Sequence, residues 1–222
     1  MNDDFKPVSD LGLMGGMFDP VHNGHLNIAI SVLGILKLDE VRLIPCGNPV
    51  HRDRVFASRD HRMAMLELAI TGNSQLGIDN REFRSKDPSY TLNTLYAIKQ
   101  EMPQCRLYYI MGQDSFNTMP SWYRWKEIFS LAHVVVAGRP GIEPLFDALL
   151  KDEYDKRVVK TAAEMKQFGS GKIFSAKVDL LDISSSLVRK KIAAGENVEK
   201  LLPEKVASYV KTHKLYSLEE NS

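Results

Sequence analysis

Short apolar runs alternate along the chain with longer segments in which apolar residues recur at helical spacing. Short apolar runs are typical of strands buried in a sheet, and the longer spacing indicates helices with one buried face. We expect strands over residues 11–14, 41–45, 76–79, 106–111, 133–137 and 172–178. We expect helices over residues 23–37, 58–70, 91–102, 143–168, 184–194 and 203–213.

Residue types with known end preferences support several of these boundaries. Ser58 is a good N-cap for the second helix, and Gly72 is a residue type that ends helices. Pro103 closes the helix that begins at Thr91. Pro203 is expected at the first position of the last helix, where its missing N–H is not needed.

The alternation of strands and helices predicts an α/β fold with a mostly parallel sheet and helices on both faces. No repeat, low-complexity tract or Gly/Ser linker divides the chain, so we expect one domain over residues 1–222. We expect residues 1–10 to form a disordered N-terminal extension and residues 142–171 to form a peripheral helical segment.

The expected sheet also predicts where a ligand binds. Ligands of such sheets lie beyond the carboxyl ends of the strands, where the strand order reverses. Residues in the loops at these ends are therefore the first candidates for chemistry. The loops follow Met14, Pro45, Met111, Ala137 and Val178.

Composition narrows the function classes. Hydrophobic residues make up 44% of the 222 and charged residues 26%, which are globular values and exclude disordered and fibrous proteins. The 29 Lys and Arg against 28 Asp and Glu leave no basic surplus, so we expect neither a nucleic acid nor a membrane as partner. Cys46 and Cys105 form no CxxC, which argues against a disulfide scaffold or a cysteine zinc site. Without a charged leader or a long apolar stretch, we expect a cytoplasmic protein.

The densest polar signal lies between the first expected strand and helix, where Gly15 and Gly16 precede His22 and His25. Glycines at a strand end let backbone N–H groups approach an anion, and the next helix start adds positive potential. Two imidazoles at this spacing share one face of a helical turn and can donate hydrogen bonds to a phosphoryl oxygen. The alternatives are a turn with two packed histidines and a metal-binding pair that lacks a nearby third ligand. We favour phosphate chemistry.

A second signal opens the helix after the last strand, where Ser184, Ser185 and Ser186 are followed by Arg189. Serines at a helix start supply hydroxyls and backbone N–H groups together, and a guanidinium one turn later can reach the same phosphate. The alternative is a simple N-cap followed by a surface arginine. Taken by itself, this motif favours that alternative.

Together the two motifs resemble a paired signature of the nucleotidylyltransferase superfamily. The motifs are GGMFDPVHNGH at residues 15–25 and ISSSLVR at residues 183–189. Finer motifs resemble those of the bacterial nicotinate-nucleotide adenylyltransferases, and the similarity extends from about residue 11 to residue 216. The finer motifs are NPVHR at 48–52, PSYT at 88–91, MGQDS at 111–115, SWYRW at 121–125 and GRPG at 138–141.

The resemblance implies a Rossmann-like, doubly wound sheet and an enzyme of NAD biosynthesis. Such an enzyme transfers the adenylyl group of ATP to nicotinate mononucleotide and yields deamido-NAD and pyrophosphate. This chemistry needs positioning and charge neutralisation rather than an enzyme nucleophile. Mg²⁺ is the implied cofactor, held mainly by substrate phosphates and water, so no metal site of protein ligands is expected.

The resemblance also implies roles for single residues on the ATP side. His22, His25 and Arg189 match the catalytic residues, of which the histidines stabilise the reacting phosphates. The implied ATP-binding residues are Gly15, Gly16, Met17, Phe18, His22, His25, Gly112, Asp114, Ile183, Ser184, Ser185, Ser186 and Arg189.

On the mononucleotide side, the resemblance implies that Trp122 stacks on the pyridine ring. Backbone N–H groups near Tyr90, Thr91 and Tyr123 would accept the nicotinate carboxylate, and residues 51–52 would hold the mononucleotide phosphate. The alternatives are a core or rim tryptophan and a solvated basic loop. The implied substrate-binding residues are Asn48, His51, Arg52, Tyr90, Thr91, Trp122, Tyr123 and Arg139.

Two positions depart from the family pattern. Met17 stands where a threonine or serine is usual, so one hydroxyl near the phosphate is missing. Ser186 stands where the signature has threonine, which keeps the hydroxyl but loses the methyl group that restricts its rotamer. Neither change removes a histidine or Arg189, so we expect an active enzyme.

Several alternatives stay open at this point. Nicotinamide mononucleotide is the nearest other acceptor, because selection of an acid over an amide depends on backbone geometry. Adenylyl transfer to 4′-phosphopantetheine and cytidylyl transfer are more distant alternatives. A nucleotide-binding regulator without turnover would be favoured by loss of a histidine or of Arg189, and RNA binding needs a basic face. A monomer and a homo-oligomer both fit the pattern of apolar residues.

Overall fold

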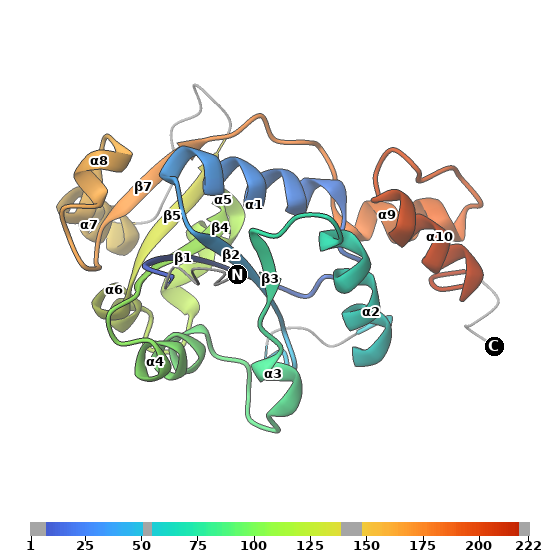
Figure 1. Ribbon diagram of the computed structural model, residues 1–222, viewed down its shortest axis with the longest axis horizontal. Helices are drawn as coiled ribbons and strands as arrows, with labels where there is room; N and C mark the ends of the chain where they lie inside the picture. The colour runs from blue at the N-terminus through green and yellow to red at the C-terminus, as the bar shows by residue number, and fades with distance from the viewer. Residues whose placement is uncertain (1–7, 51–54, 139–147, 218–222) are drawn as a thin grey trace, which may run out of the picture.

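The computed structural model describes residues 8–50, 55–138 and 148–217. Seven parallel strands form one sheet in the order β3-β2-β1-β4-β5-β7-β6 (Figure 1). The predicted parallel sheet is therefore confirmed. The strands are β1 (Asp10–Gly16), β2 (Glu40–Pro45), β3 (Leu76–Ile78), β4 (Arg106–Gly112), β5 (Ala132–Gly138), β6 (Val158–Val159) and β7 (Ile173–Lys177).

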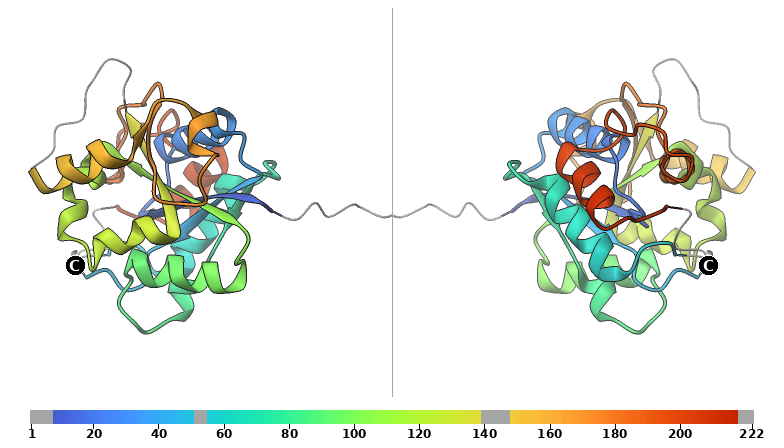
Figure 2. Two further views of the ribbon diagram at one scale, coloured as in Figure 1. Left: turned by 90° about the vertical axis from the view of Figure 1, so that its left-hand side faces the viewer. Right: turned by 90° about the vertical axis from the view of Figure 1, so that its right-hand side faces the viewer.

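Helices cover both faces of the sheet, as the doubly wound fold requires. The α-helices are α1 (Asn23–Leu36), α2 (Arg59–Ile70), α3 (Arg81–Arg84), α4 (Thr91–Glu101), α5 (Gln113–Thr118), α6 (Ile128–Leu131), α7 (Ala148–Arg157), α8 (Ala162–Met165), α9 (Ser185–Ala193) and α10 (Glu204–Thr212). Two 3₁₀ turns, η1 (Met119–Ser121) and η2 (Trp125–Glu127), follow α5. Figure 2 shows α1 and α4 on opposite sides of the sheet.

Each face of the sheet has its own hydrophobic core. One core joins the sheet to α1, α2, α9 and α10 through buried residues such as Val32, Leu66 and Val206. The other joins it to α4, α6 and α7 through residues such as Leu95 and Ile128. The central strands are buried on both faces, which explains why they appear in the sequence as continuous apolar runs.

Local capping explains several helix ends. Ser58 caps α2 by accepting a hydrogen bond from the His61 N–H, and Gly72 follows this helix with a φ of +90°. At α10 the prediction is wrong by one position, because Pro203 is the N-cap and not the first helical residue. Proline is suitable there too, since its ring already restricts φ.

The N-terminal prediction is wrong for the part of residues 1–10 that the structure describes. Residues 1–7 lie outside the described residues. Ser9 and Asp10 donate their backbone N–H groups to the Asp39 carboxylate, and Asp10 begins β1. The Asp10 carboxylate in turn accepts hydrogen bonds from Arg106 and Lys166. These charged partners order a polar segment that has few apolar residues of its own.

The expected continuous helix over residues 143–168 is also wrong. Residues 139–147 lie outside the described residues, and the rest is divided into α7, β6 and α8. Val158 and Val159 are β-branched and pair with β7 as the edge strand β6. Thr161 then caps α8 by accepting a hydrogen bond from the Glu164 N–H. Within the described residues, no helix is long and apolar enough to cross a membrane.

His133 on β5 is a fully buried imidazole with both nitrogens engaged. Its Nδ1 accepts a hydrogen bond from the Lys172 N–H at 3.3 Å, so the proton lies on Nε2, 3.1 Å from the Phe168 carbonyl oxygen. Burial lowers the pKa of His133 from 6.5 to about 4. The neutral form is therefore part of the folded structure, and a proton added to Nδ1 would face an N–H group.

This burial predicts a loss of stability in acid. The unfolded chain binds a proton at His133 near pH 6.5 and the folded chain only near pH 4, so stability declines as the pH falls through that window. Protonation of this side chain lowers the free energy of unfolding by about 3 kcal/mol across the window. We expect His133→Gln to flatten the pH dependence of the free energy of unfolding, measured by urea titration between pH 7 and about 4. Parallel curves for the two proteins would contradict the assignment.

Candidate functional site

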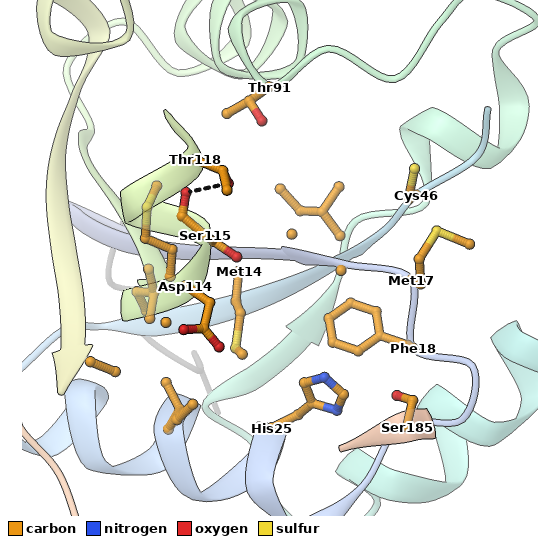
Figure 3. A pocket seen from close by; sticks show the side chains of 18 of the residues that line it. Met14, Met17, Phe18, His25, Cys46, Thr91, Asp114, Ser115, Thr118 and Ser185 are labelled. Carbon is orange, nitrogen blue, oxygen red and sulfur yellow. Dashed lines mark hydrogen bonds between the residues drawn. The ribbon is translucent and has the colours of Figure 1, made fainter. Parts of the chain in front are cut away.

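The carboxyl ends of the central strands surround a cavity of about 1070 Å³. It lies at the junction of β1 and β4, from which the chain continues to helices on opposite faces of the sheet. The loops after β1, β2, β4 and β7 contribute lining residues, as predicted, and Ala137 and Gly138 line the cavity from the end of β5. In Figure 3, Asp114 and Ser115 face Met17 and Cys46 across the cavity, and His25 lies beside Phe18.

His22 and His25 lie together at the start of α1. Their rings stack with centroids 3.6 Å apart and an angle of 24° between the planes. His25 Nδ1 accepts a hydrogen bond from the His22 backbone N–H at 3.2 Å, so the proton of a neutral His25 is on Nε2. His22 Nδ1 is buried and has no hydrogen-bond partner among the described residues. The pair therefore carries unused hydrogen-bonding capacity at a helix N-terminus, where anions are favoured.

Both imidazoles are neutral at pH 7 in the free protein. Burial lowers the pKa of His22 from 6.5 to about 4. Burial, and then repulsion by His22, lowers the pKa of His25 well below 6.5. A neutral imidazole still donates one N–H, and an anion beside it raises its pKa by favouring the charged form. At neutral pH the two histidines of the free protein therefore add no net charge to the site.

Two glycines make room for this arrangement. A Cβ atom on Gly24 would lie 3.0 Å from His22 Nδ1, so any larger residue forces the imidazole to shift. A Cβ atom on Gly15 would lie 2.7 Å from the Tyr109 hydroxyl. The glycines in the first motif therefore allow side chains to approach the backbone closely, in addition to exposing N–H groups.

Arg189 lies beside the cavity and not in its wall. One guanidinium nitrogen donates to the Asp19 carbonyl oxygen at 2.7 Å, and another lies 3.2 Å from Ser186 Oγ. The guanidinium carbon is 4.0 Å from the centre of the Phe56 ring. These contacts hold the cation next to the loop that follows β1.

The three serines at the start of α9 line the cavity, and each hydroxyl has a hydrogen-bond partner. Ser184 is the N-cap and accepts a hydrogen bond from the Leu187 N–H at 3.1 Å. Ser185 donates to the Pro20 carbonyl oxygen at 2.9 Å, which connects α9 to the loop after β1. The capping interpretation of this motif is therefore correct for Ser184, and Ser185 has a second, tertiary contact.

Aromatic side chains line the cavity on its other side. Trp122 lies edge-on to Tyr109 at 6.1 Å, and Tyr90 stacks on Tyr123 at 4.6 Å. The Tyr109 hydroxyl lies 3.3 Å from Thr91 Oγ1, and burial raises the pKa of Tyr109 to about 12, so this hydroxyl is neutral. This part of the cavity offers flat aromatic surfaces together with the hydroxyl groups of Thr91 and Tyr109.

The structure brings most of the predicted residues together. Those that line the cavity are Gly15, Gly16, Met17, Phe18, His22, His25, Tyr90, Thr91, Gly112, Asp114, Trp122, Tyr123, Ile183, Ser184, Ser185 and Ser186. Asn48 is not among them, because its amide donates to the carbonyl oxygens of Ser85 and Asp87 and accepts from Arg59. His51, Arg52 and Arg139 lie outside the described residues.

Sequence analysis missed several lining residues. Ser89 and Ser115 lie within the motifs that were found, so their motifs were a usable signal. Tyr109 lies in the middle of an apolar strand, and nothing in that pattern distinguishes it from a core residue. Glu82 belongs to the short helix α3, which was not predicted. Glu82 and Asp114 are the acidic residues of the wall, and the described wall contains no lysine or arginine.

The described residues contain no group of three or more histidine, cysteine or carboxylate side chains that could hold a metal ion. An ion that accompanies a phosphate ligand needs no such group, since Mg²⁺ commonly keeps several waters and binds phosphate oxygens. Asp114 is the carboxylate nearest in sequence to the carboxyl end of β4, and it lines the cavity.

Comparisons with known proteins agree with the site. The sequence pattern of the cytidylyltransferase-like family matches residues 13–191. A "Probable nicotinate-nucleotide adenylyltransferase" of Marinomonas sp. (strain MWYL1) is 38% identical over 94% of this chain and 95% of its own length. Another protein of that name, from Pseudoalteromonas atlantica (strain T6c), is 40% identical over 93% of this chain and 94% of its own length.

A solved structure shows the same fold. It is "Plasmodium falciparum nicotinic acid mononucleotide adenylyltransferase complexed with NaAD", with a TM-score of 0.72 and 18% sequence identity. The similarity covers 94% of this chain and 97% of the Plasmodium chain. At this identity the likeness concerns the fold alone.

The stacked histidines predict an unusual titration. In the free protein we expect the His22 imidazole to titrate near pH 4, as followed by the NMR signal of its Cε1–H. Inorganic triphosphate should raise this pKa, because the anion stabilises the imidazolium form. The signal of His213, which is exposed and does not line the cavity, is the control and should not respond to the ligand. A His22 pKa near 6.5 without ligand, or no response to triphosphate, would contradict this description.

Proposed function

The chain belongs to the cytidylyltransferase-like family and, within it, to the nicotinate-nucleotide adenylyltransferases, and from that premise we propose how its residues carry out the reaction. It is a nucleotidyltransferase of NAD biosynthesis that joins ATP and nicotinate mononucleotide to give deamido-NAD and pyrophosphate. A phosphate oxygen of the mononucleotide forms a bond to the α-phosphorus of ATP, and the bond from that phosphorus to the leaving pyrophosphate breaks.

The stacked histidine pair is the observation that carries the mechanism. In our proposal, His22 and His25 donate hydrogen bonds to the reacting phosphates and gain positive charge as negative charge develops there. The N-terminus of α1 adds to the same potential. No side chain forms a covalent bond to substrate, so the catalytic contribution is positioning and charge stabilisation.

We propose that the triphosphate of ATP lies between the histidines and α9. Arg189 reaches it from beside the cavity, and backbone N–H groups of Gly16 and Met17 and the serine hydroxyls complete the contacts. The Asp114 carboxylate accepts a hydrogen bond from a hydroxyl of the adenosine ribose. Gly15, Phe18, Gly112 and Ile183 form the remaining apolar and backbone surface of this side.

Mg²⁺ is part of the proposal because the described wall contains two carboxylates and no lysine or arginine. A bound phosphate chain therefore needs further positive charge, which Mg²⁺ would supply at its oxygen atoms. Most of the coordination would come from the nucleotide and from water, because the described residues hold no cluster of metal ligands.

The nicotinate ring is proposed to lie against Trp122. Tyr90 is the N-cap of α4 and makes no side-chain capping bond, so the first N–H groups of this helix are available for a carboxylate. An amide in that position would place its NH₂ group against N–H donors. This geometry favours the acid over the amide. Thr91 and Tyr123 line the same region, and His51, Arg52 and Arg139, which lie outside the described residues, stay predicted substrate contacts.

The proposal also covers domain organisation and binding partners. We propose that the whole chain works as one nucleotidylyltransferase domain with ATP and nicotinate mononucleotide as its partners, without nucleic acid or membrane. A cytoplasmic location stays a prediction from the sequence, and a monomer and a homo-oligomer both stay open.

The deciding assay measures pyrophosphate release with Mg²⁺ and ATP, comparing nicotinate and nicotinamide mononucleotides at equal concentration. We expect strong preference for the acid, because the start of α4 presents donors to its carboxylate. Equal rates or preference for the amide would overturn the substrate assignment while leaving the phosphate mechanism in place. No release with either would overturn the proposed function.

The placement of His22 can be tested without changing either histidine. Gly24→Ala puts a methyl group 3.0 Å from His22 Nδ1, and we expect kcat to fall by about tenfold as the ring is displaced. Gly34→Ala on the same helix is the matched control, because its Cβ would meet nothing within 4 Å. That variant should keep full kcat and gain about 0.5–1 kcal/mol of stability. Full turnover in Gly24→Ala would show that the histidine stack is not needed.

A further inference from the structure

We infer that Tyr216, near the C-terminus, is a positioning residue that acts through the Asp19 carboxylate on the phosphate-binding side of the site. The inference is argued from hydrogen-bond geometry, and it rests on the proposed function because the assay measures adenylyl transfer. The Tyr216 hydroxyl donates to Asp19 Oδ1 at 2.7 Å, across nearly the whole length of the chain. Neither residue lines the cavity, so any effect must be transmitted through other side chains.

Asp19 is the point at which separate segments meet. Its side chain is buried, with 3% of the residue exposed. Besides the Tyr216 hydroxyl, the carboxylate accepts the backbone N–H groups of Phe56 at 2.7 Å and Ala57 at 3.1 Å. Three donors from two distant segments therefore determine where this carboxylate lies. A buried carboxylate that loses one of them must rearrange or remain poorly solvated.

From Asp19 the contacts continue to Arg189 by two routes. The Asp19 carbonyl oxygen accepts a hydrogen bond from the Arg189 guanidinium at 2.7 Å. The Phe56 ring, whose backbone N–H is bound to the Asp19 carboxylate, lies 4.0 Å from the same guanidinium carbon. The cation is thus held by the backbone of Asp19 and by an aromatic ring that Asp19 positions.

The neighbouring residue connects Asp19 to the histidines. Phe18 precedes Asp19 with a φ of +48°, in the left-handed region that non-glycine residues seldom occupy. Its ring is 1% exposed and meets the His25 ring edge-on, with centroids 5.0 Å apart. A change in the position of Asp19 therefore changes the packing of Phe18 against His25.

The turn after α10 places the Tyr216 hydroxyl at the Asp19 carboxylate. Figure 1 shows α10 beside α2, and the chain turns back after this helix with positive φ at Lys214 and Tyr216. Leu215 between them is buried with 4% exposed, which anchors the turn in the core. Burial and the negative charge of Asp19 raise the pKa of Tyr216, so the hydroxyl stays protonated as a donor.

The test is Tyr216→Phe, which removes only the hydroxyl. We expect the KM for ATP to rise about tenfold and kcat to fall severalfold, as for loss of a buried hydrogen bond to a charged acceptor. The KM for the mononucleotide should stay within about twofold, because Trp122 and Tyr90 make no contact with Asp19 or Arg189 among the described interactions. This division between the two substrates separates positioning from general loss of structure.

Tyr209→Phe is the matched control. Tyr209 lies on α10, and its hydroxyl is 2.9 Å from His61 Nδ1 and is not bonded to Asp19. The Tyr209→Phe variant also loses one tyrosine hydroxyl from the C-terminal part of the chain. We expect both KM values and kcat to stay those of the unchanged protein. Phe56→Leu is a second probe: Phe56 is 45% exposed, and this variant keeps the backbone hydrogen bond to Asp19. It should raise the KM for ATP in the same way.

The outcomes separate this inference from the proposed function. If Tyr216→Phe behaves as Tyr209→Phe does, or if its two KM values rise equally, Tyr216 has no positioning role. If Tyr216→Phe does not fold, the result for Phe56→Leu decides, and an unchanged KM for ATP overturns the inference. If the unchanged protein transfers no adenylyl group, the proposed function fails, and calorimetric Kd values for ATP test Tyr216 by the same comparison.

Discussion

The Asp19 carboxylate is the constraint on which the phosphate side of this protein depends. In the proposed function, the loop between β1 and α1 offers backbone N–H groups to a phosphate ligand, so it cannot use those groups to stabilise itself. It also holds Phe18 in the left-handed region, which is unfavourable for a residue with a side chain. The shape of the loop is instead imposed from outside, by donors to Asp19 from residues 56–57 and Tyr216. Arg62 adds a further contact by donating to the Met17 carbonyl oxygen at 3.0 Å.

The charged side chains of the cavity wall do not match the charge of its proposed ligands. The described wall has two carboxylates and two histidines that burial keeps neutral, yet its proposed ligands are strongly anionic. Positive potential comes from the starts of α1 and α9, from Arg189 beside the wall and, in the proposal, from Mg²⁺ that arrives with the nucleotide. Without a ligand, the described wall supplies no positive side-chain charge of its own at neutral pH. In the proposed mechanism its histidines respond to the ligand's charge, which concentrates stabilisation where negative charge develops during the reaction.

Particular residues show how far prediction from sequence could go. His22 and His25 were found because their spacing on a helix start already implies a shared face, and the stack confirms it. The sheet and its site-bearing loops were predictable because buried parallel strands appear as continuous apolar runs. The short strand β6 was missed because two valines within a charged segment carry no signal until β7 lies beside them. Asn48 was placed in the site by its motif, but its amide is used to bind neighbouring backbone.

The amino-acid sequence by itself determined the order of strands and helices, the position of the site at the strand ends and the chemical groups available there. These properties depend on periodicity and on residue types close together in the chain, which local physics relates directly to structure. Only the tertiary structure decided that Tyr216 meets Asp19, that Arg189 lies beside the cavity and that both histidines are neutral. Each of these depends on burial and on contacts between residues far apart in the chain, and neither is defined until the chain has folded.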